Sequence, residues 1–125
     1  MQAKSFKNNQ LSFNERCYEL LKLIPKGKVS TYKAIAQALN TKAYQAVGNA
    51  MANNPNPIIV PCHRVVKTNG ELGEFALGVP KKISLLKDEG VIIKGNKVVD
   101  FSNHFYDFSD LLDLLKTKTK KPNYK

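Results

Sequence analysis

The chain contains 125 residues, of which 42% are hydrophobic, and it carries a formal net charge of +10 at pH 7. This length fits one domain with a hydrophobic core of its own. No apolar run approaches the roughly 18 residues of a membrane-spanning helix, and the polar N-terminus lacks the apolar core of a signal peptide. We therefore expect a soluble intracellular protein with no membrane partner, whose two cysteines are free thiols.

The positive charge is concentrated in one part of the chain. No Asp or Glu lies between Glu19 and Glu71, whereas the same segment holds seven basic residues: Lys22, Lys26, Lys28, Lys33, Lys42, Arg64 and Lys67. An uneven basic field favours a polyanionic partner such as nucleic acid. A protein that is merely basic would show the same composition, so charge alone leaves both interpretations open.

Residues 1–12 are polar and have no apolar periodicity, so we predict a flexible arm there. The first helix is predicted to follow, because apolar residues recur at helical spacing: Phe13, Cys17, Leu20, Leu21 and Ile24. Ser12 or Asn14 can cap its start, and Pro25 ends it. Cys17 lies on the apolar face, which indicates a small buried hydrophobe rather than a reactive thiol.

Two more helices are predicted next. Ser30 or Thr31 can cap the second helix, and Asn40 is a plausible stop. Its apolar positions follow the helical pattern: Tyr32, Ile35, Ala36 and Leu39. The third helix is predicted from Tyr44 to Asn53, with four inward positions: Ala46, Val47, Ala50 and Met51. Two short helices joined by a few polar residues are a helix-turn-helix candidate.

The other face of the third helix carries small or neutral side chains, Gln45, Asn49 and Ala52. Such a face can approach a nucleic-acid groove closely, although an ordinary solvated helix face would look the same. Gly48 costs a helix about 1 kcal/mol relative to Ala, so we expect close packing at this position.

Asn54-Pro55-Asn56-Pro57 is predicted to break the third helix, and residues 58–66 are predicted to form a buried strand or extended segment. Pro80 can open a further helix that runs to Glu89. Residues 91–101, with Gly95-Asn96 between two apolar runs, predict a hairpin.

The remaining residues predict a short amphipathic helix over 111–115 and a basic tail from Lys116 to Lys125. The predicted fold class is α+β and mainly helical. Its parts are an arm at 1–12, a central domain at 13–90, and a hairpin, short helix and basic tail at 91–125.

Cys62, in the sequence Pro-Cys-His-Arg, is the candidate nucleophile. A thiol with an unperturbed pKa of about 8.5 is mostly protonated near neutrality and needs a base. His63 is the obvious base, but neighbours in a strand point to opposite faces, so we expect a bridging water. Glu89 could accept the other imidazole proton and fix the tautomer. A buried structural cysteine is the alternative interpretation of an isolated Cys-His pair.

Five ordered stretches of the chain resemble the C-terminal domain of the O6-alkylguanine-DNA alkyltransferases, the methylated-DNA–protein-cysteine methyltransferase family. These stretches are Val29-Ser-Thr-Tyr-Lys-Ala-Ile-Ala, Ala46-Val-Gly-Asn-Ala-Met, Asn54-Pro55, Ile59-Val-Pro-Cys-His-Arg-Val-Val66 and Leu85-Leu-Lys-Asp-Glu-Gly90. The resemblance implies a winged helix-turn-helix-like DNA-binding domain with a short active-site strand and a C-terminal hairpin.

The resemblance also implies roles for single residues. Cys62 would accept the alkyl group, His63 would act through water as its base, and Glu89 would hold His63. Tyr32 would assist extrusion of the nucleotide and supply a proton to the departing guanine. Asn54 would brace the turn between the recognition helix and the active-site segment.

Backbone groups of Cys62 and Val65 would read the guanine edge, and Phe75 and Ala76 would line the base site, with the Ala76 amide near O6. The residues implied to bind DNA are Lys42, Tyr44, Gln45, Asn49, Ala52 and Arg64. The helix-turn-helix of this family enters the minor groove, which the small face of the third helix suits. The implied partner is double-stranded DNA containing O6-alkylguanine, bound by a monomer without cofactor or metal. Its expected location is cytoplasmic, nucleoid-associated or nuclear through DNA binding.

Two departures from the family pattern stand out. The recognition helix usually carries an arginine finger that fills the gap left by the flipped base, and here the position is Gln45. Either Gln45 fills the gap with weaker effect or the neighbouring Tyr44 intrudes instead. The loop that commonly contains Tyr-Ser-Gly-Gly is Phe75-Ala-Leu-Gly78, which lacks both hydroxyls. We also expect no N-terminal domain of the family type and no zinc site.

Two other functions stay open at this point. A non-catalytic alkyltransferase-like protein would bind lesions without repairing them, although such proteins usually have tryptophan at the position of Cys62. A plain helix-turn-helix regulator would bind DNA by sequence and have an unreactive Cys62.

Overall fold

The computed structural model describes residues 11–108 of the chain. In chain order its elements are α1 (Phe13–Leu21), β1 (Ser30–Thr31), α2 (Tyr32–Ala38), α3 (Tyr44–Ala52), the 3-10 helix η3 (Cys62–Arg64), β2 (Val65–Val66), α4 (Val79–Asp88), β3 (Ile93–Lys94), β4 (Lys97–Val98) and α5 (Phe101–His104). Helices with two small sheets confirm the predicted fold class. None of the described helices is long and apolar enough to cross a membrane. The predictions for residues 1–10, for the amphipathic segment and for the basic tail fall outside the described residues.

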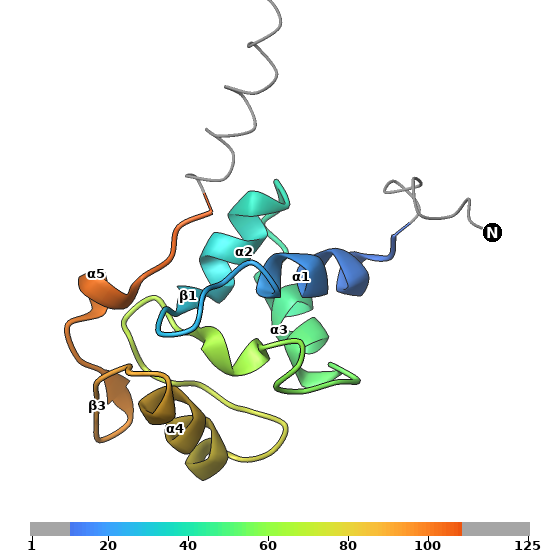
Figure 1. Ribbon diagram of the computed structural model, residues 1–125. Helices are drawn as coiled ribbons and strands as arrows, with labels where there is room; N and C mark the ends of the chain where they lie inside the picture. The colour runs from blue at the N-terminus through green and yellow to red at the C-terminus, as the bar shows by residue number, and fades with distance from the viewer. Residues whose placement is uncertain (1–10, 109–125) are drawn as a thin grey trace, which may run out of the picture.

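Helices α1, α2 and α3 lie together, with α3 in contact with both of the others (Figure 1). Ser12 starts α1 with a capping box, in which its hydroxyl accepts from the Glu15 amide at 3.0 Å and its own amide donates to the Glu15 carboxylate at 2.9 Å. The Thr31 hydroxyl caps α2 by accepting from the Ala34 amide at 2.9 Å. The predicted helix-turn-helix pair, α2 and α3, is therefore present.

The main hydrophobic core lies among these three helices and η3. The hydroxyl of Tyr18 donates to the Ala50 carbonyl at 3.0 Å and so ties α1 to α3. The prediction that Cys17 is a buried hydrophobe is confirmed, because its side chain is fully buried in this core. The buried members of the core are Cys17, Leu21, Ile24, Ala34, Ile35, Ala36, Val47, Ala50, Met51, Val60, Cys62, Val65 and Phe108.

A parallel pair of short strands connects the start of α2 with the segment after η3. Ser30 of β1 faces Val65 of β2, and Thr31 faces Val66. On the other side of β1, Val29 forms a parallel bridge with Phe105, with Val29 N donating to the His104 carbonyl at 2.8 Å. Residues far apart in the sequence thus hold β1 from both edges.

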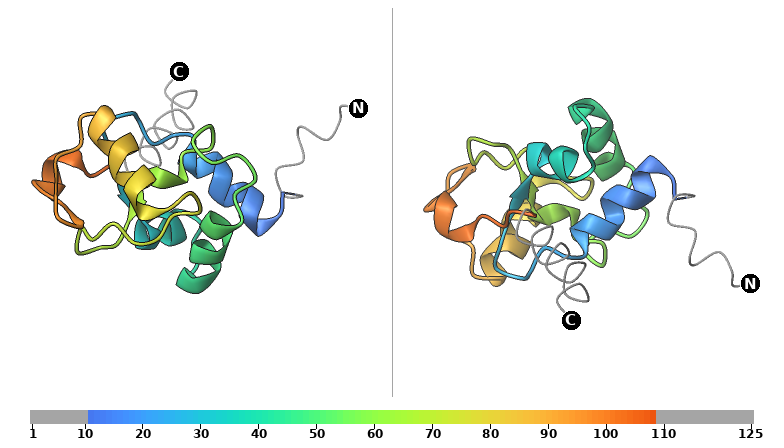
Figure 2. Two further views of the ribbon diagram at one scale, coloured as in Figure 1. Left: turned by 90° about the horizontal axis from the view of Figure 1, so that it is seen from below. Right: turned by 90° about the horizontal axis from the view of Figure 1, so that it is seen from above.

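The second half of the molecule contains α4, the hairpin and α5, and both further views place it on the side opposite α1 and α3 (Figure 2). Pro80 lies in the first turn of α4, as predicted. The predicted hairpin is also confirmed, with Ile93 opposite Val98 in β3 and β4. A second core fills this half, with Val29, Val66, Leu72, Leu86, Val91 and Val98 as its buried members.

The predicted strand over residues 58–66 is wrong for most of its length. Residues 62–64 form η3, and only Val65 and Val66 form a strand. Two prolines in this region, Pro57 and Pro61, have no N–H to donate to a β ladder, which favours a turn.

The turn before η3 has an unusual backbone. Ile58 has a φ of 81°, in a region that β-branched residues rarely adopt. The Val60 amide donates to the Asn56 carbonyl at 2.9 Å, and the Asn54 side chain closes the turn by donating to the Val60 carbonyl at 2.7 Å. Cys62 and His63 have helical backbone, so the alternation of side chains in a strand does not apply to them and their side chains need not point to opposite faces.

The expectation of close packing at Gly48 is also wrong. A Cβ added there would meet no atom within 4 Å outside the helix itself. Gly48 lies on the side of α3 that lines an open cavity, so its missing side chain leaves space outside the protein core.

Lys82 is buried in the centre of the second half, with no exposed side-chain surface. Its ammonium donates to three carbonyls: Val65 of β2 at 2.8 Å, Leu72, and Glu74 at 3.2 Å. Burial lowers its pKa to about 8, and the three acceptors match the three N–H donors of the charged form. Through these hydrogen bonds, Lys82 connects the loop that contains Leu72 and Glu74 to strand β2.

We expect Lys82→Met to lower the free energy of unfolding by about 2 kcal/mol, because buried carbonyls would lose their donor. Urea denaturation followed by circular dichroism measures the change. Lys81→Met is the matched control, since Lys81 is the exposed neighbour on the same helix. Equal stability of the two variants would contradict the role of Lys82.

Phe108 is 2% exposed and belongs to the main core. We expect Phe108→Ala to cost about 3 kcal/mol of unfolding free energy, the range for a buried aromatic side chain. Thermal and urea denaturation are suitable measurements, with Ile92→Ala as the control because Ile92 is 54% exposed. A loss no larger than in the control would show that residues after α5 do not stabilise the domain.

Candidate active site

Cys62 lies at the wall of a cavity of about 600 Å³. One side of the cavity is formed by α3, through Tyr44, Gln45, Gly48, Asn49, Met51 and Ala52. The opposite side is formed by Lys67 and the loop residues Gly73, Glu74, Phe75 and Ala76, and Tyr32 of α2 also contributes. The cavity therefore joins the predicted nucleophile to the predicted recognition helix.

Asn54 shapes the backbone that carries Cys62. It is 6% exposed, and besides its bond to Val60 it accepts from the Asn56 amide at 2.9 Å. Both bonds lie within the turn between α3 and η3, which is where a bracing residue is expected.

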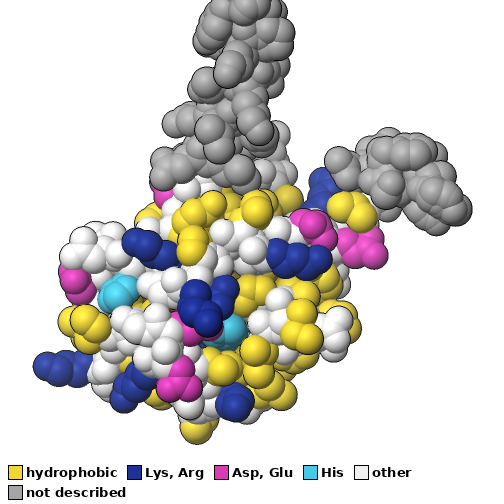
Figure 3. Space-filling model, viewed as in Figure 1, with side chains coloured by type: hydrophobic (Ala, Val, Ile, Leu, Met, Phe, Trp, Pro, Cys, Tyr) yellow, Lys and Arg dark blue, Asp and Glu magenta, His cyan; other side chains and the backbone are white. Residues whose placement is uncertain are grey.

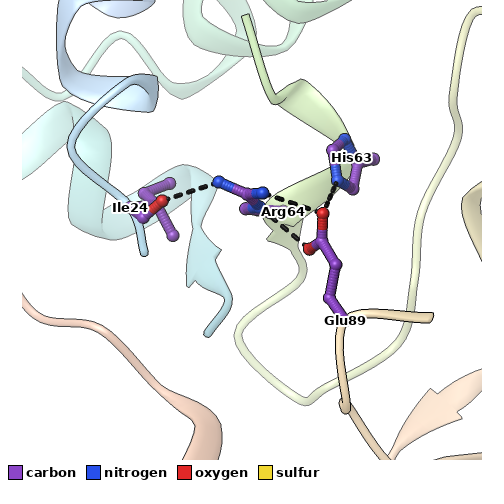
Figure 4. Close-up of polar contacts among 4 residues, drawn as sticks. All are labelled: Ile24, His63, Arg64 and Glu89. Atoms are coloured by element: carbon purple, nitrogen blue, oxygen red, sulfur yellow. Dashed lines mark hydrogen bonds and ion pairs between the residues drawn. The ribbon is translucent and has the colours of Figure 1, made fainter. Parts of the chain in front are cut away.

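His63 and Arg64 both bind the carboxylate of Glu89 (Figure 4). His63 Nε2 lies 3.0 Å from Oε2, while Arg64 donates from Nε to Oε1 at 2.9 Å and from Nη2 to Oε2 at 2.8 Å. The remaining nitrogen of the Arg64 fork, Nη1, donates to the Ile24 carbonyl at 2.9 Å. Glu89 thus joins η3 to the end of α4, and Arg64 extends the connection to the segment after α1.

The charge states of this cluster favour His63 as a neutral base. Burial lowers the pKa of His63, and this effect outweighs the hydrogen bond that His63 donates to Glu89, which raises it. Burial alone would raise the pKa of Glu89, but hydrogen bonds from Arg64 and His63 hold it below its usual value. A carboxylate that accepts from Nε2–H leaves the lone pair of the imidazole on Nδ1. Nδ1 is buried and has no hydrogen-bond partner among the described residues.

The two cysteines differ in their surroundings. Burial raises the pKa of the Cys17 thiol to about 11, and Cys17 does not line the cavity. Burial also raises the pKa of Cys62, but Asn54 and the charge of Lys82 oppose the shift. Cys62 is therefore a protonated thiol at rest, and Asn54 and Lys82 reduce the rise in its pKa without cancelling it.

Tyr32 lines the cavity, and its hydroxyl lies against the loop at Gly73. A Cβ on Gly73 would lie 3.1 Å from the Tyr32 hydroxyl oxygen, and the φ of Gly73 is +72°, which favours glycine. Burial raises the pKa of Tyr32, so its hydroxyl keeps its proton. This close approach places a proton donor inside the cavity.

Two predicted site residues lie elsewhere. Arg64, predicted to bind DNA, donates hydrogen bonds from its guanidinium to Glu89 and to the Ile24 carbonyl within the protein. Val65, predicted to help read guanine, is fully buried and does not line the cavity, and its carbonyl accepts from Lys82. The other predicted DNA-binding residue outside the cavity, Lys42, is exposed in the turn before α3.

Three residues near the site were not predicted as site residues: the buried Lys82, and Lys67 and Glu74, two charged residues that line the cavity. The sequence does indicate that Lys82 is buried, because it lies three residues after Val79 and four before Leu86, on the apolar face of α4. A lysine at such a position needs buried acceptors.

The basic residues do not form one patch on the face shown in Figure 3, where Lys and Arg side chains are spread among acidic and hydrophobic ones. Some are neutralised locally, as in the pair of Lys22 with Glu19 at 3.0 Å. Within residues 11–108, no three His, Cys, Asp or Glu side chains come together as a metal site.

Comparisons with known proteins agree with this geometry. The methylated-DNA–protein-cysteine methyltransferase of Thermococcus gammatolerans is 51% identical over 80 residues, which are 63% of this chain and 45% of that protein. The crystal structure of Mycobacterium tuberculosis OGT in complex with DNA is 39% identical, with a TM-score of 0.61 over 63% of this chain and 50% of that one. The crystal structure of S. pombe Atl1 in complex with damaged DNA containing O6-carboxymethylguanine is 29% identical, with a TM-score of 0.67 over 76% of this chain and 94% of that one.

The chain spans about half the length of the curated relatives it matches. The match of the family itself extends over residues 12–91, which include α1 to α4, the cavity and Glu89. The chain belongs to the family described as 6-O-methylguanine DNA methyltransferase, DNA binding domain.

Proposed function

We propose that this chain repairs DNA by moving the alkyl group of O6-alkylguanine onto Cys62, once per molecule. The observation that carries the proposal is the position of Cys62 in a cavity bordered by the recognition helix α3, next to a His63 that Glu89 orients. Relatives named methylated-DNA–protein-cysteine methyltransferase support it.

The chemistry is a single displacement. The thiol proton of Cys62 passes through a water to Nδ1 of His63, whose other nitrogen is bound to Glu89. The sulfur attacks the alkyl carbon, an S–C bond forms, and the bond from that carbon to O6 breaks. The electron pair stays on the guanine, which takes up a proton from Tyr32, and the proton held by His63 returns to Tyr32 through solvent. The products are a thioether and unmodified guanine.

The reaction requires the guanine to leave the duplex, because the O6 substituent of a stacked base is out of reach of a buried thiol. The cavity volume of about 600 Å³ accommodates a purine, and α3 borders its mouth. We therefore propose double-stranded DNA as the partner, approached through the exposed face of α3 by a monomer, and a location wherever the cellular DNA lies. Phe75 and Ala76 would line the base site.

A second function, lesion binding without transfer, is favoured by one observation. S. pombe Atl1, solved with damaged DNA, is similar to this chain over 94% of its own length. The oriented His63–Glu89 pair beside Cys62 favours transfer over binding alone, because lesion binding has no use for a base.

Intact-protein mass spectrometry tests the transfer directly. We expect the wild type, incubated with a duplex containing one O6-methylguanine, to gain the mass of a single methyl group and to stop at one per molecule. Cys62→Ala should gain nothing, and Cys17→Ala, the control for the other thiol, should react like the wild type. Lesion-selective binding without any mass gain would assign the chain to the binding class.

The orienting role of Glu89 predicts a change in the pH dependence of transfer. Burial keeps the pKa of His63 below 6.5, so transfer by the wild type should decline only as the pH falls below that value. Glu89→Gln removes a group that raises this pKa, so the decline should move to still lower pH. The rate near neutrality should fall roughly a hundredfold as the base loses its orientation.

Single-turnover rates between pH 5 and 9 measure both effects. Asp88→Asn is the matched control, because Asp88 is the exposed residue next to Glu89. A decline that stays in place or moves to higher pH in Glu89→Gln would contradict the assignment of His63 as the base.

A further inference from the structure

We propose that Tyr44 is the wedge that fills the gap left in the DNA stack when the alkylated guanine is extruded. This inference rests on the proposed function and adds a residue to it. Extrusion leaves two base pairs without a stacking partner, and proteins that open DNA from the minor groove hold the gap with an inserted apolar or aromatic side chain.

Tyr44 is the aromatic residue of α3, and it lies at the rim of the cavity. Its neighbours on that rim, Gln45, Asn49 and Ala52, are neutral and offer no ring that could stack on a base. A Tyr ring has the flat π-face that stacks on any base regardless of sequence. Tyr44 is therefore the side chain of this rim that can replace a base.

The ring of Tyr44 is available for this role. It is 44% exposed and belongs to neither hydrophobic core. The described residues include other exposed large hydrophobic side chains, but none of these lines the cavity: Leu23, Ile58, Ile59, Leu77, Ile92 and Val99. Exposure of an aromatic ring at the cavity rim distinguishes Tyr44 from apolar residues scattered over the surface.

The backbone before the ring is fixed. The Tyr44 amide donates to the Lys42 carbonyl at 2.8 Å, and the Ala43 amide donates to the Thr41 hydroxyl at 3.1 Å. This turn sets where α3 begins and so where the ring leaves the helix. A wedge needs such a rigid base, because a mobile side chain would lose conformational entropy on insertion.

Gly48 provides the space beside the ring. It follows Tyr44 by four residues, so the two lie on the same face of α3, and both line the cavity. No atom lies within 4 Å of a Cβ built at Gly48, so the space opens outward to the rim. Because Gly48 has no side chain, DNA can approach the backbone of α3 closely at this position while the Tyr44 ring inserts into the stack.

The test separates extrusion from chemistry by comparing two substrates. Single-turnover transfer is measured with a duplex containing O6-methylguanine and with the same lesion in a single strand, which has no paired stack to open. We expect Tyr44→Ala to slow transfer to the duplex roughly tenfold or more, with a much smaller effect on the single strand. Tyr44→Phe, which keeps the ring, should react with the duplex like the wild type.

Leu23→Ala is the matched control, because Leu23 is exposed to a similar extent, 43%, and does not line the cavity. Thermal denaturation of each variant verifies folding. Unchanged duplex transfer in Tyr44→Ala would overturn the wedge, as would an equal loss on both substrates or a larger duplex loss in Gln45→Ala.

Failure of the proposed function would look different, since the wild type would then transfer to neither substrate. The wedge is in that case tested by binding to the lesion-containing duplex. Equal affinity of the wild type and Tyr44→Ala would overturn it, and a weaker affinity of Tyr44→Ala that Tyr44→Phe restores would support it.

Discussion

The carboxylate of Glu89 holds together the parts of the chain on which the site depends. It accepts two hydrogen bonds from Arg64 and one from His63, so a charge that would be unfavourable in the interior is matched by a guanidinium in a bidentate pair. Through the bond of Arg64 to the Ile24 carbonyl, the same cluster reaches the segment that follows α1. The orientation of the imidazole is therefore fixed by three regions of sequence at once, and the family match from residue 12 to residue 91 contains all of them.

The two walls of the cavity are attached to this centre by different groups. The wall made by α3 is connected through Asn54, which closes the turn into η3, and through the hydrogen bond of Tyr18 to the last part of α3. The loop wall is connected through Lys82, whose ammonium binds both β2 and the loop. Each wall therefore has its own anchor, and both anchors, Asn54 and Lys82, also oppose the rise in the pKa of Cys62.

The sequence was informative where local rules decide the structure. Thr31 begins a helix because its hydroxyl can cap it, apolar residues at helical spacing located α1, α2 and α3, and Pro80 marked the start of α4. It was misleading around Cys62, where a run of apolar residues indicated a strand but two prolines and the bonds of Asn54 produce a turn and a 3-10 helix. The partners of Arg64 and Lys82 could not be predicted, because they are separated from these residues by many positions or are backbone carbonyls that any residue carries. The residues at the cavity were found mainly through resemblance.

The burial of Cys62 has a consequence for the protein before it meets damaged DNA. A thiol that is 4% exposed and has a raised pKa presents little thiolate to the solvent. Peroxides and small electrophiles react chiefly with exposed thiolates, so such a cysteine is oxidised or modified slowly. Under the proposed function the sulfur reacts only once, so every accidental reaction of Cys62 would inactivate one molecule. The same apolar surroundings that make Cys62 dependent on a base therefore preserve its capacity during storage in the cell.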